Sequence, residues 1–373
     1  MTIDRRAMML GAAGLTASAM LPRGAWAKAP NSRKWVIVNA LGGLGDPNDP
    51  DATDPYSPRV LAEAHASGVT AINCTLGYVA GPADPFEKSV RDVAEMDMLI
   101  RRRPRDLLKI LSVADIHRAK AERKIGIIYG FQNGAMMGKD ASRVDIFANM
   151  GVRIFQLTYN PVNQLGGGSM AADNPGLTPF GREVIERLNA QKMIVDLSHS
   201  GERTCLDAAR ASAAPISINH TGCRAVTDLP RNKTDAELRL VAEKGGFVGI
   251  YFMPFLNASG HARAEDVVAH IDHAVNICGE DHVGIGTDGY VTQIDDLKRY
   301  EAVLAKEIAE RRAAGISATG ERPDTYPFVV DLRGPEQFRK LIALLSARGY
   351  SAARIEKIMG LNFLRHAESV WGG

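Results

Sequence analysis

The chain has 373 residues, of which 45% are hydrophobic and 24% are charged, and its formal net charge at pH 7 is +2. A chain of this length and apolar content can bury one large core. The nearly balanced charge leaves no basic excess that would indicate a nucleic-acid partner, and there is no acidic tail.

The amino-terminal segment has the parts of an export signal. The pair Arg5-Arg6 precedes an apolar stretch, and residues 25–27 read A-W-A, which is an A-x-A cleavage site. We therefore expect residues 1–27 to be a twin-arginine signal peptide and residues 28–373 to be the mature domain, located in the periplasm or secreted. No later stretch has the roughly eighteen uninterrupted apolar residues that a membrane span needs, so we expect no span in the mature chain.

Short apolar runs rich in Val and Ile alternate with segments of helical length along the rest of the chain. Such runs are typical of parallel strands buried on both faces. Their alternation with helices predicts a single-domain α/β fold, a TIM-type (β/α)8 barrel, whose active-site residues come from the carboxyl ends of the strands. The predicted strands are residues 35–40, 71–75, 125–130, 152–158, 193–197, 216–219, 247–251 and 283–286.

Two Gly- and Pro-rich stretches, residues 42–58 and 163–179, follow strand ends and should lie over the mouth of the barrel. They could be ordinary connections or a lid and a pocket wall. Near the carboxyl terminus, residues 335–371 carry Leu, Ile and Phe at steps of three and four, which predicts a helical pair that ends at Gly360 and resumes at Asn362.

Four cysteines are spread along the chain and form no C-x-x-C pair, which does not favour a thiolate zinc site. An oxidising periplasm would allow a disulfide, but the spacing cannot choose the partners. We expect buried thiols at Cys74, Cys205, Cys223 and Cys278.

Two histidines lie at the ends of successive predicted strands. His199 follows the run 193–197 and His220 follows the run 216–219. Because neighbouring strands lie about 4.8 Å apart, the two imidazoles can converge on one zinc ion, for which imidazole is a usual ligand. They could equally be packed or hydrogen-bonded without metal. His270 and His273 lie on a predicted helix, for which a solvated face is the preferred interpretation.

Several motifs together resemble one known family. They read VDLSHSG around His199, ISINHTGCRAVTDLPRN around His220, T-Y-N at residues 158–160 and GLNFLRHAESVW near the carboxyl terminus. They resemble the membrane (renal) dipeptidase family of zinc peptidases along almost the whole mature chain. The resemblance implies a binuclear zinc centre in which His199 and His220 hold the second ion.

The resemblance also implies roles for three further residues. Asp288 matches the family's acid that handles the proton of the attacking water, and Arg231 matches the arginine that grips the substrate. Tyr159 stands where the family has a further pocket histidine. A guanidinium suits a substrate carboxylate because it can donate two parallel hydrogen bonds.

The chain departs from the family at the first metal site. Where the family reads Asp-Gly-His-x-Asp, residues 39–43 read N-A-L-G-G, and Gln132 stands at the position of the bridging glutamate. A neutral amide is a poor bridge between two dications. We therefore expect at most one zinc ion per chain, with Asp288 or Gln132 as the third contact, although acids in residues 46–54 could in principle rebuild the first site.

The resemblance implies an exported metallohydrolase that acts on a dipeptide or another small amide with a free carboxylate. Asp288 would be the general base and Arg231 would hold the substrate. Two alternatives stay open. One is a metal-free enzyme of small-molecule maturation that uses Tyr159, His199 and Asp288, and the other is a periplasmic binding protein. Family members often form dimers, so a homodimer is a further expectation.

Overall fold

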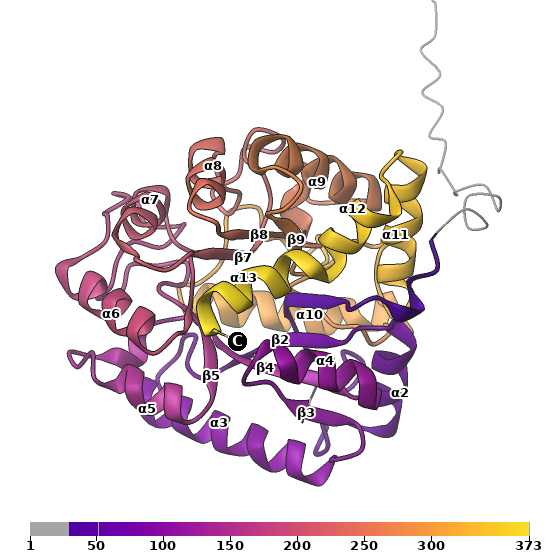
Figure 1. Ribbon diagram of the computed structural model, residues 1–373, viewed down its shortest axis with the longest axis horizontal. Coiled ribbons are helices and arrows are strands. Elements are labelled where there is room, and N and C mark those ends of the chain that lie inside the picture. The colour runs from indigo at the N-terminus through magenta and orange to yellow at the C-terminus, as the bar shows by residue number, and fades with distance from the viewer. Residues whose placement is uncertain (1–29, 51, 373) are drawn as a thin grey trace, which may run out of the picture.

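The computed structural model describes residues 30–50 and 52–372, and its strands and helices alternate as in a (β/α)8 barrel (Figure 1). Each predicted apolar run contributes a strand to one parallel sheet, so the predicted TIM barrel is confirmed. The predicted signal peptide, residues 1–27, lies outside the described residues. In spatial order the strands are β1 (Val38–Gly42), β2 (Ala71–Leu76), β4 (Ile125–Phe131), β5 (Val152–Gln156), β6 (Ile194–Asp196), β7 (Ser217–Thr221), β8 (Phe247–Ile250) and β9 (Val283–Ile285).

One short strand, β3 (Leu107–Lys109), pairs with β4 outside this path and was not expected from the sequence. Many of the helices begin at a side-chain cap, and three of these caps precede a proline that fits the first helical turn, as at Ser57-Pro58. The helices are α2 (Pro58–Ser67), α3 (Pro85–Arg102), α4 (Val113–Glu122), α5 (Arg143–Asn149), α6 (Pro179–Ala190), α7 (Glu202–Ala211), α8 (Asp235–Glu243), α9 (Ala264–Cys278), α10 (Leu297–Ala313), α11 (Gln337–Ala347), α12 (Ala352–Glu356) and α13 (Asn362–Trp371), with 3₁₀ turns at Ser32–Lys34, Ala135–Met137 and Pro254–Leu256.

The barrel closes where β1 meets β9. The backbone N–H of Asp288 donates to the carbonyl of Leu41 (2.9 Å). The buried Asn39 side chain reinforces this seam, because its Oδ1 accepts from the Thr287 N–H (2.8 Å) and its Nδ2 donates to the Thr287 Oγ1 (2.8 Å). These bonds pair groups that an open sheet edge would leave unpaired. Barrel closure therefore also fixes the backbone at Asp288.

The carboxyl-terminal helix α13 covers the amino-terminal end of the barrel and lies across it in Figure 1. Phe363 packs in one apolar cluster with Val38 and Phe247, which begin strands β1 and β8. The predicted helical pair is present, but the predicted break at Gly360 is wrong. A π-helical turn, Lys357–Leu361, joins α12 to α13. Gly360 lets this turn pack closely on the segment before β1, because a Cβ there would lie 2.1 Å from the carbonyl oxygen of Val36.

The solvated helix face predicted for His270 and His273 is wrong for His270, which is fully buried. Its Nδ1 accepts a hydrogen bond from the Cys223 N–H (2.8 Å), and its Nε2 lies 3.0 Å from the carbonyl of Leu256. His273 is partly exposed and pairs with Asp235. His270 therefore ties α9 to the loops after β7 and β8, which a sequence pattern for α9 alone does not reveal.

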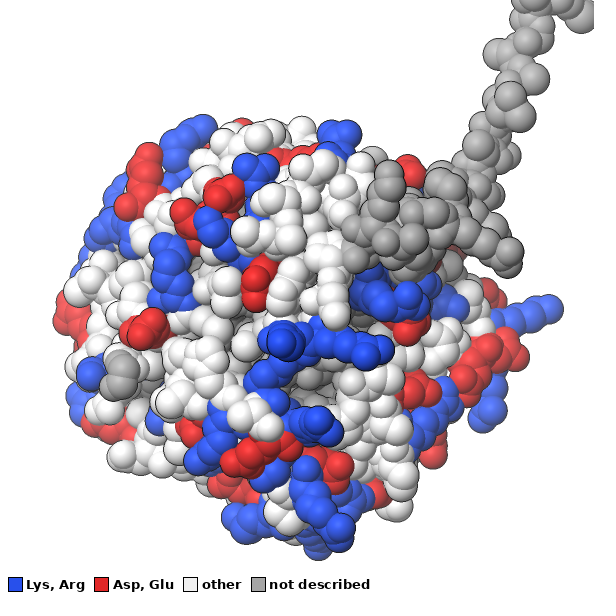
Figure 2. Space-filling model, turned by 45° about the vertical axis from the view of Figure 1, so that its right-hand side comes forward, with Lys and Arg blue, Asp and Glu red and all other residues white. Residues whose placement is uncertain are grey.

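The four cysteines are buried, and no two of them are bonded within the part of the chain that the structure describes. On the face shown in Figure 2, basic and acidic side chains are interspersed around a short run of Lys and Arg, as the near-neutral net charge suggests. Across residues 30–50 and 52–372, no helix is both long and apolar enough to cross a membrane.

Helix α13 plugs the amino-terminal end of the barrel, and truncating Phe363 tests how much this plug contributes to stability. Phe363→Ala should lower the free energy of unfolding by about 3–5 kcal/mol, because it removes a ring that is 1% exposed. Leu361→Ala changes a side chain that is 40% exposed and should cost less than about 0.5 kcal/mol. Urea denaturation measures both losses, and similar losses for the two variants would contradict the role given to α13.

Candidate functional site

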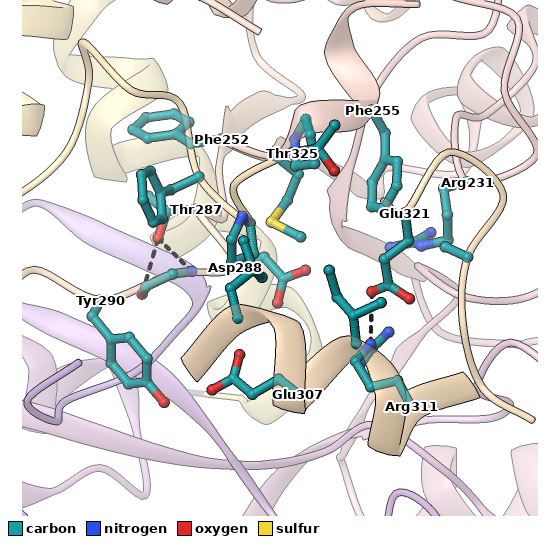
Figure 3. A pocket seen from close by; sticks show the side chains of 18 of the residues that line it. Arg231, Phe252, Phe255, Thr287, Asp288, Tyr290, Glu307, Arg311, Glu321 and Thr325 are labelled. Atoms are coloured by element: carbon teal, nitrogen blue, oxygen red, sulfur yellow. Dashed lines mark hydrogen bonds and ion pairs between the residues drawn. The ribbon is translucent and has the colours of Figure 1, made fainter. Parts of the chain in front are cut away.

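One cavity of about 610 Å³ at the carboxyl ends of the strands brings most of the predicted site residues together. Arg231, Tyr159, His199, Asp288 and Gln132 all line it, and Figure 3 shows Arg231 and Asp288 among its side chains. His220, the remaining predicted site residue, does not line the cavity. It is fully buried and lies against His199, with 4.9 Å between the ring centroids.

The imidazole of His199 has a neighbour on each polar side and on one face. Its Nδ1 lies 2.7 Å from Asn160 Oδ1, its Nε2 lies 3.3 Å from a guanidinium nitrogen of Arg231, and Tyr159 stacks on the ring at 4.2 Å. The Asn160 Nδ2 donates to the carbonyl of Ile316 (2.8 Å), so its Oδ1 must accept from Nδ1. His199 therefore presents the lone pair of Nε2 to the Arg231 side.

Burial and the charge of Arg231 lower the pKa of both His199 and His220 well below the usual value for histidine, so both rings are neutral. Neither ring nitrogen of His220 has a hydrogen-bond partner among the described residues. Burying an unpaired polar group is costly, and a metal ion is one group that would satisfy a neutral imidazole.

The carboxylate of Asp196 holds the strand ends that carry these histidines. It is buried and accepts hydrogen bonds from the Ser198 N–H (2.9 Å), the Ser198 hydroxyl and the Asn219 N–H (3.1 Å). The Ser198 Oγ in turn accepts from the backbone N–H of His220 (3.1 Å). One side chain thus links the end of β6 to the irregular end of β7.

Arg231 places a buried positive charge beside the histidines. It is 2% exposed, its Nη1 donates to the Ser198 carbonyl (2.7 Å), and it lies over the ring of Tyr251 at 5.7 Å. Within the described part of the chain, no carboxylate pairs with it. A buried guanidinium with unused donors in a cavity is suited to binding a carboxylate.

Asp288 occupies the left-handed backbone region, with φ of 56°. A non-glycine residue in this region stores strain and commonly marks a functional position. Burial raises the pKa of Asp288 to about 6, although Arg231 and Arg311 oppose this rise. A carboxyl group with such a pKa can exchange a proton near neutral pH.

The segment that follows β9 supplies the outer wall of the cavity and was not anticipated. Arg311 on α10 donates to the Tyr159 hydroxyl (3.2 Å) and to Glu321 (2.7 Å), and Figure 3 shows Arg311 and Glu321 at the cavity. Because Ile316 accepts from Asn160, this segment contacts both residues that hold His199. The sequence does contain a signal that one face of α10 is buried. Tyr300, Leu304 and Ile308 are apolar residues at four-residue steps in an otherwise charged helix.

The loop at residues 163–179 contributes no residue to the cavity lining, so it is not the wall that one interpretation of the sequence suggested. It instead packs beside the end of β6, where the Ser169 N–H donates to the carbonyl of His199 (2.7 Å). Gly168 permits this packing, because a Cβ there would lie 2.0 Å from the carbonyl oxygen of Tyr159. From the loop at residues 42–58, Pro47 reaches the cavity.

The described residues do not fit a pair of metal ions. Leu41 offers no ligand atom, the Asn39 amide is bonded to Thr287, and Gln132 Nε2 donates to the Thr75 hydroxyl (2.6 Å). Among the described acids of the loop after β1, Asp54 pairs with Arg103, and neither Asp46, Asp49 nor Asp54 lines either cavity.

One ion fits better, because His199 Nε2 and the unpaired nitrogens of His220 are neutral donors on neighbouring rings. No cluster of three or more His, Cys, Asp or Glu that could hold a metal occurs in the described ranges. A bound ion would therefore need other ligands, such as water, to complete its coordination.

Comparison with models of known families identifies one family. The model of the family described as membrane dipeptidase (peptidase family M19) matches residues 60–319. The chain is 29% identical over 301 residues to a Klebsiella pneumoniae protein from the pqqA 5′ region, a match that covers 78% of this chain and 98% of that protein.

Two further similarities carry functional names. The chain is 29% identical over 261 residues to the dipeptidase tcpJ of Claviceps purpurea, and this match covers 67% of the chain but only 52% of that protein. The chain thus spans about half the length of the Claviceps relative. An amidohydrolase from Pseudomonas aeruginosa has a similar crystal structure, with a TM-score of 0.79 and 28% identity over 91% of this chain and 98% of that one.

Removing the Asp196 carboxylate should destabilise the fold. Asp196→Ala leaves the Ser198 and Asn219 donors without their acceptor, at a cost of about 1–3 kcal/mol for each donor that stays unpaired. The control is Asp173→Ala at an exposed position, where a change of less than about 0.5 kcal/mol is expected. Thermal and urea unfolding measure the difference, and equal stability of the two variants would refute this role.

Proposed function

The chain belongs to the membrane dipeptidase family of peptide-bond hydrolases, peptidase family M19, and from this premise we propose that it cleaves a dipeptide or another small amide that bears a carboxylate, with at most one zinc ion. The observation that carries the proposal is the meeting of Arg231, His199 and Asp288 in one cavity. These three supply a carboxylate anchor, a metal donor and a proton acceptor.

Arg231 binds the substrate carboxylate. Its guanidinium is held rigidly by the Ser198 carbonyl and has no competing carboxylate among the described residues. A preorganised guanidinium loses little side-chain entropy on binding, and its planar fork fixes the orientation of the ligand. The amide of the bound substrate is thereby positioned toward Asp288, which lines the same cavity.

Asp288 handles the proton of the hydrolytic water. As the water oxygen attacks the carbonyl carbon, the carboxylate takes one water proton and then delivers it to the leaving nitrogen as the C–N bond breaks. The products are an amine and a carboxylate, and Asp288 returns to its ionised state. A zinc ion held by His199 and His220 would polarise the scissile carbonyl and lower the pKa of the water.

One contact favours the alternative of a metal-free protein. The guanidinium of Arg231 lies 3.3 Å from His199 Nε2 and so faces the lone pair that a metal would use. If this contact persists in solution, Arg231 is the main positive charge near the substrate, and the protein acts without metal or only binds its ligand. Metal content separates this alternative from the main proposal.

Metal analysis provides that separation. The mature protein, purified without chelators, should contain about one zinc per chain, and His220→Ala should lose the zinc because it removes one of the two imidazole ligands. His65→Ala, at a partly exposed position on α2 paired with Asp106, should retain the wild-type content. About two zinc ions per chain would refute the single-metal proposal, and none after incubation with zinc would support the metal-free alternative.

Hydrolysis should depend on the ionisation of Asp288. Its carboxylate can accept a proton only when ionised, so kcat/KM should fall as the pH drops through about 6 and should be level above it. Asp288→Asn should lower kcat by roughly 10²–10⁴-fold, the usual contribution of a general base. Asp324→Asn, which alters an exposed carboxylate, is the control. A profile without a transition near pH 6 would contradict the assignment.

Export is a separate proposal that rests on residues 1–27. We propose that this segment directs the protein across the inner membrane and is then removed, because Arg5-Arg6, the apolar stretch and the A-W-A site follow in the required order. The mature protein would then lie in the periplasm or outside the cell. Intact-mass measurement of protein from the periplasmic fraction should give a chain that begins near Lys28.

A further inference from the structure

A second cavity, of about 250 Å³, opens directly beside the first. Asp288, Gly289 and Tyr290 line both cavities, so the two meet at the residue that handles the proton. The rest of the second cavity lies between the ends of β1 and β2 and helix α3, with Leu41 and Met96 on opposite elements. A substrate whose reacting bond lies at Asp288 therefore has this space within reach of one side chain.

The side chains of Leu41, Leu44 and Met96 form the apolar part of the wall of the second cavity, and Tyr56, Thr75 and Asp288 contribute polar atoms. Leu41, Leu44 and Met96 are almost fully buried at its sides. The hydroxyl of Tyr56 donates a hydrogen bond to the Met96 sulfur (3.4 Å). Burial raises the pKa of the Cys74 thiol to about 12, so this thiol stays uncharged.

Asp288 is the one ionisable carboxyl among the residues that line the second cavity. The nearby Asn39 amide is turned away onto Thr287 and does not reach the space. A single carboxylate among apolar groups is a poor cation site, whereas an apolar group would lose no hydrogen bonds by entering. The part of the second cavity beside Leu41, Leu44 and Met96 therefore suits a hydrocarbon group.

We propose that the second cavity is a subsite for an apolar side chain of the substrate, aliphatic or aromatic, while the substrate carboxylate lies on Arg231. The inference rests on the proposed function and deepens it, because it names the substrate class as carboxylate-bearing amides with a bulky apolar residue. Leu41 and Gly43 stand where the resemblance implies metal ligands. The same substitutions, Leu41 and Gly43, would thus remove two metal ligands and create the apolar subsite.

Binding of substrate mimics tests the subsite without requiring turnover. The probes are phosphinate isosteres of dipeptides, in which the phosphinate replaces the scissile amide. In one series the amino-terminal side chain is hydrogen, methyl, isobutyl or benzyl, and in the other the carboxyl-terminal side chain varies likewise. In one of the two series, calorimetry of the mature protein should give a Kd that falls at least about tenfold from hydrogen to isobutyl, as expected when a hydrophobic pocket is filled.

Two variants locate the effect. Leu41→Phe fills the subsite and should remove the preference for isobutyl and benzyl while leaving the Kd of the hydrogen probe within about threefold. Met96→Ala enlarges the subsite from α3 and should shift the preference toward benzyl, which keeps the test valid if Leu41→Phe does not fold. Leu361→Phe, at an exposed position, is the matched control and should behave as wild type.

The possible outcomes separate the two proposals. If no probe binds, the proposed function is refuted together with the subsite. If all probes bind with similar Kd, the proposed function stands and the subsite is refuted. If the preference exists but neither Leu41→Phe nor Met96→Ala alters it, the apolar side chain binds elsewhere and the subsite is again refuted.

Discussion

The site depends on the hydrogen-bonded seam between β1 and β9. The amide of Asn39 is bonded to both the N–H and the hydroxyl of Thr287, and the next residue, Asp288, donates its N–H to Leu41. Holding a non-glycine residue in the left-handed region costs on the order of 1–3 kcal/mol, and these buried bonds offset that cost. The same hydrogen bonds that close the barrel therefore also fix the position of Asp288.

The electrostatics of the cavity follow from the burial of its titratable groups and from the charge of Arg231. Burial and then the charge of Arg231 lower the pKa of both histidines, whereas burial raises the pKa of Asp288 and Arg231 opposes that rise. Neutral imidazoles and a weakly acidic carboxyl group can thus lie near a guanidinium without an ion pair that would consume its charge. Arg311 extends this arrangement outward, because it bonds both Glu321 and the tyrosine that stacks on His199.

The barrel could be predicted from the sequence because parallel strands buried on both faces leave a local apolar signal. The same signal placed His199 and His220 at strand ends, where strand geometry brings them together. The contribution of α10 could not be predicted, since the bond from Arg311 to Tyr159 joins residues 152 positions apart. His270 was misjudged for a related reason, because the loops that bury it are distant in sequence. Local patterns report which face is apolar and do not report which distant segment covers it.

The plug formed by α13 has a consequence for synthesis. Phe363 and Trp371 pack in the cluster that fills the amino-terminal end of the barrel, yet they follow all of the barrel strands in the chain. While they remain in the ribosomal tunnel, strands made much earlier lie beside an open, apolar interior. The core is therefore completed only after α13 has left the tunnel, and until then the apolar strands are exposed to aggregation.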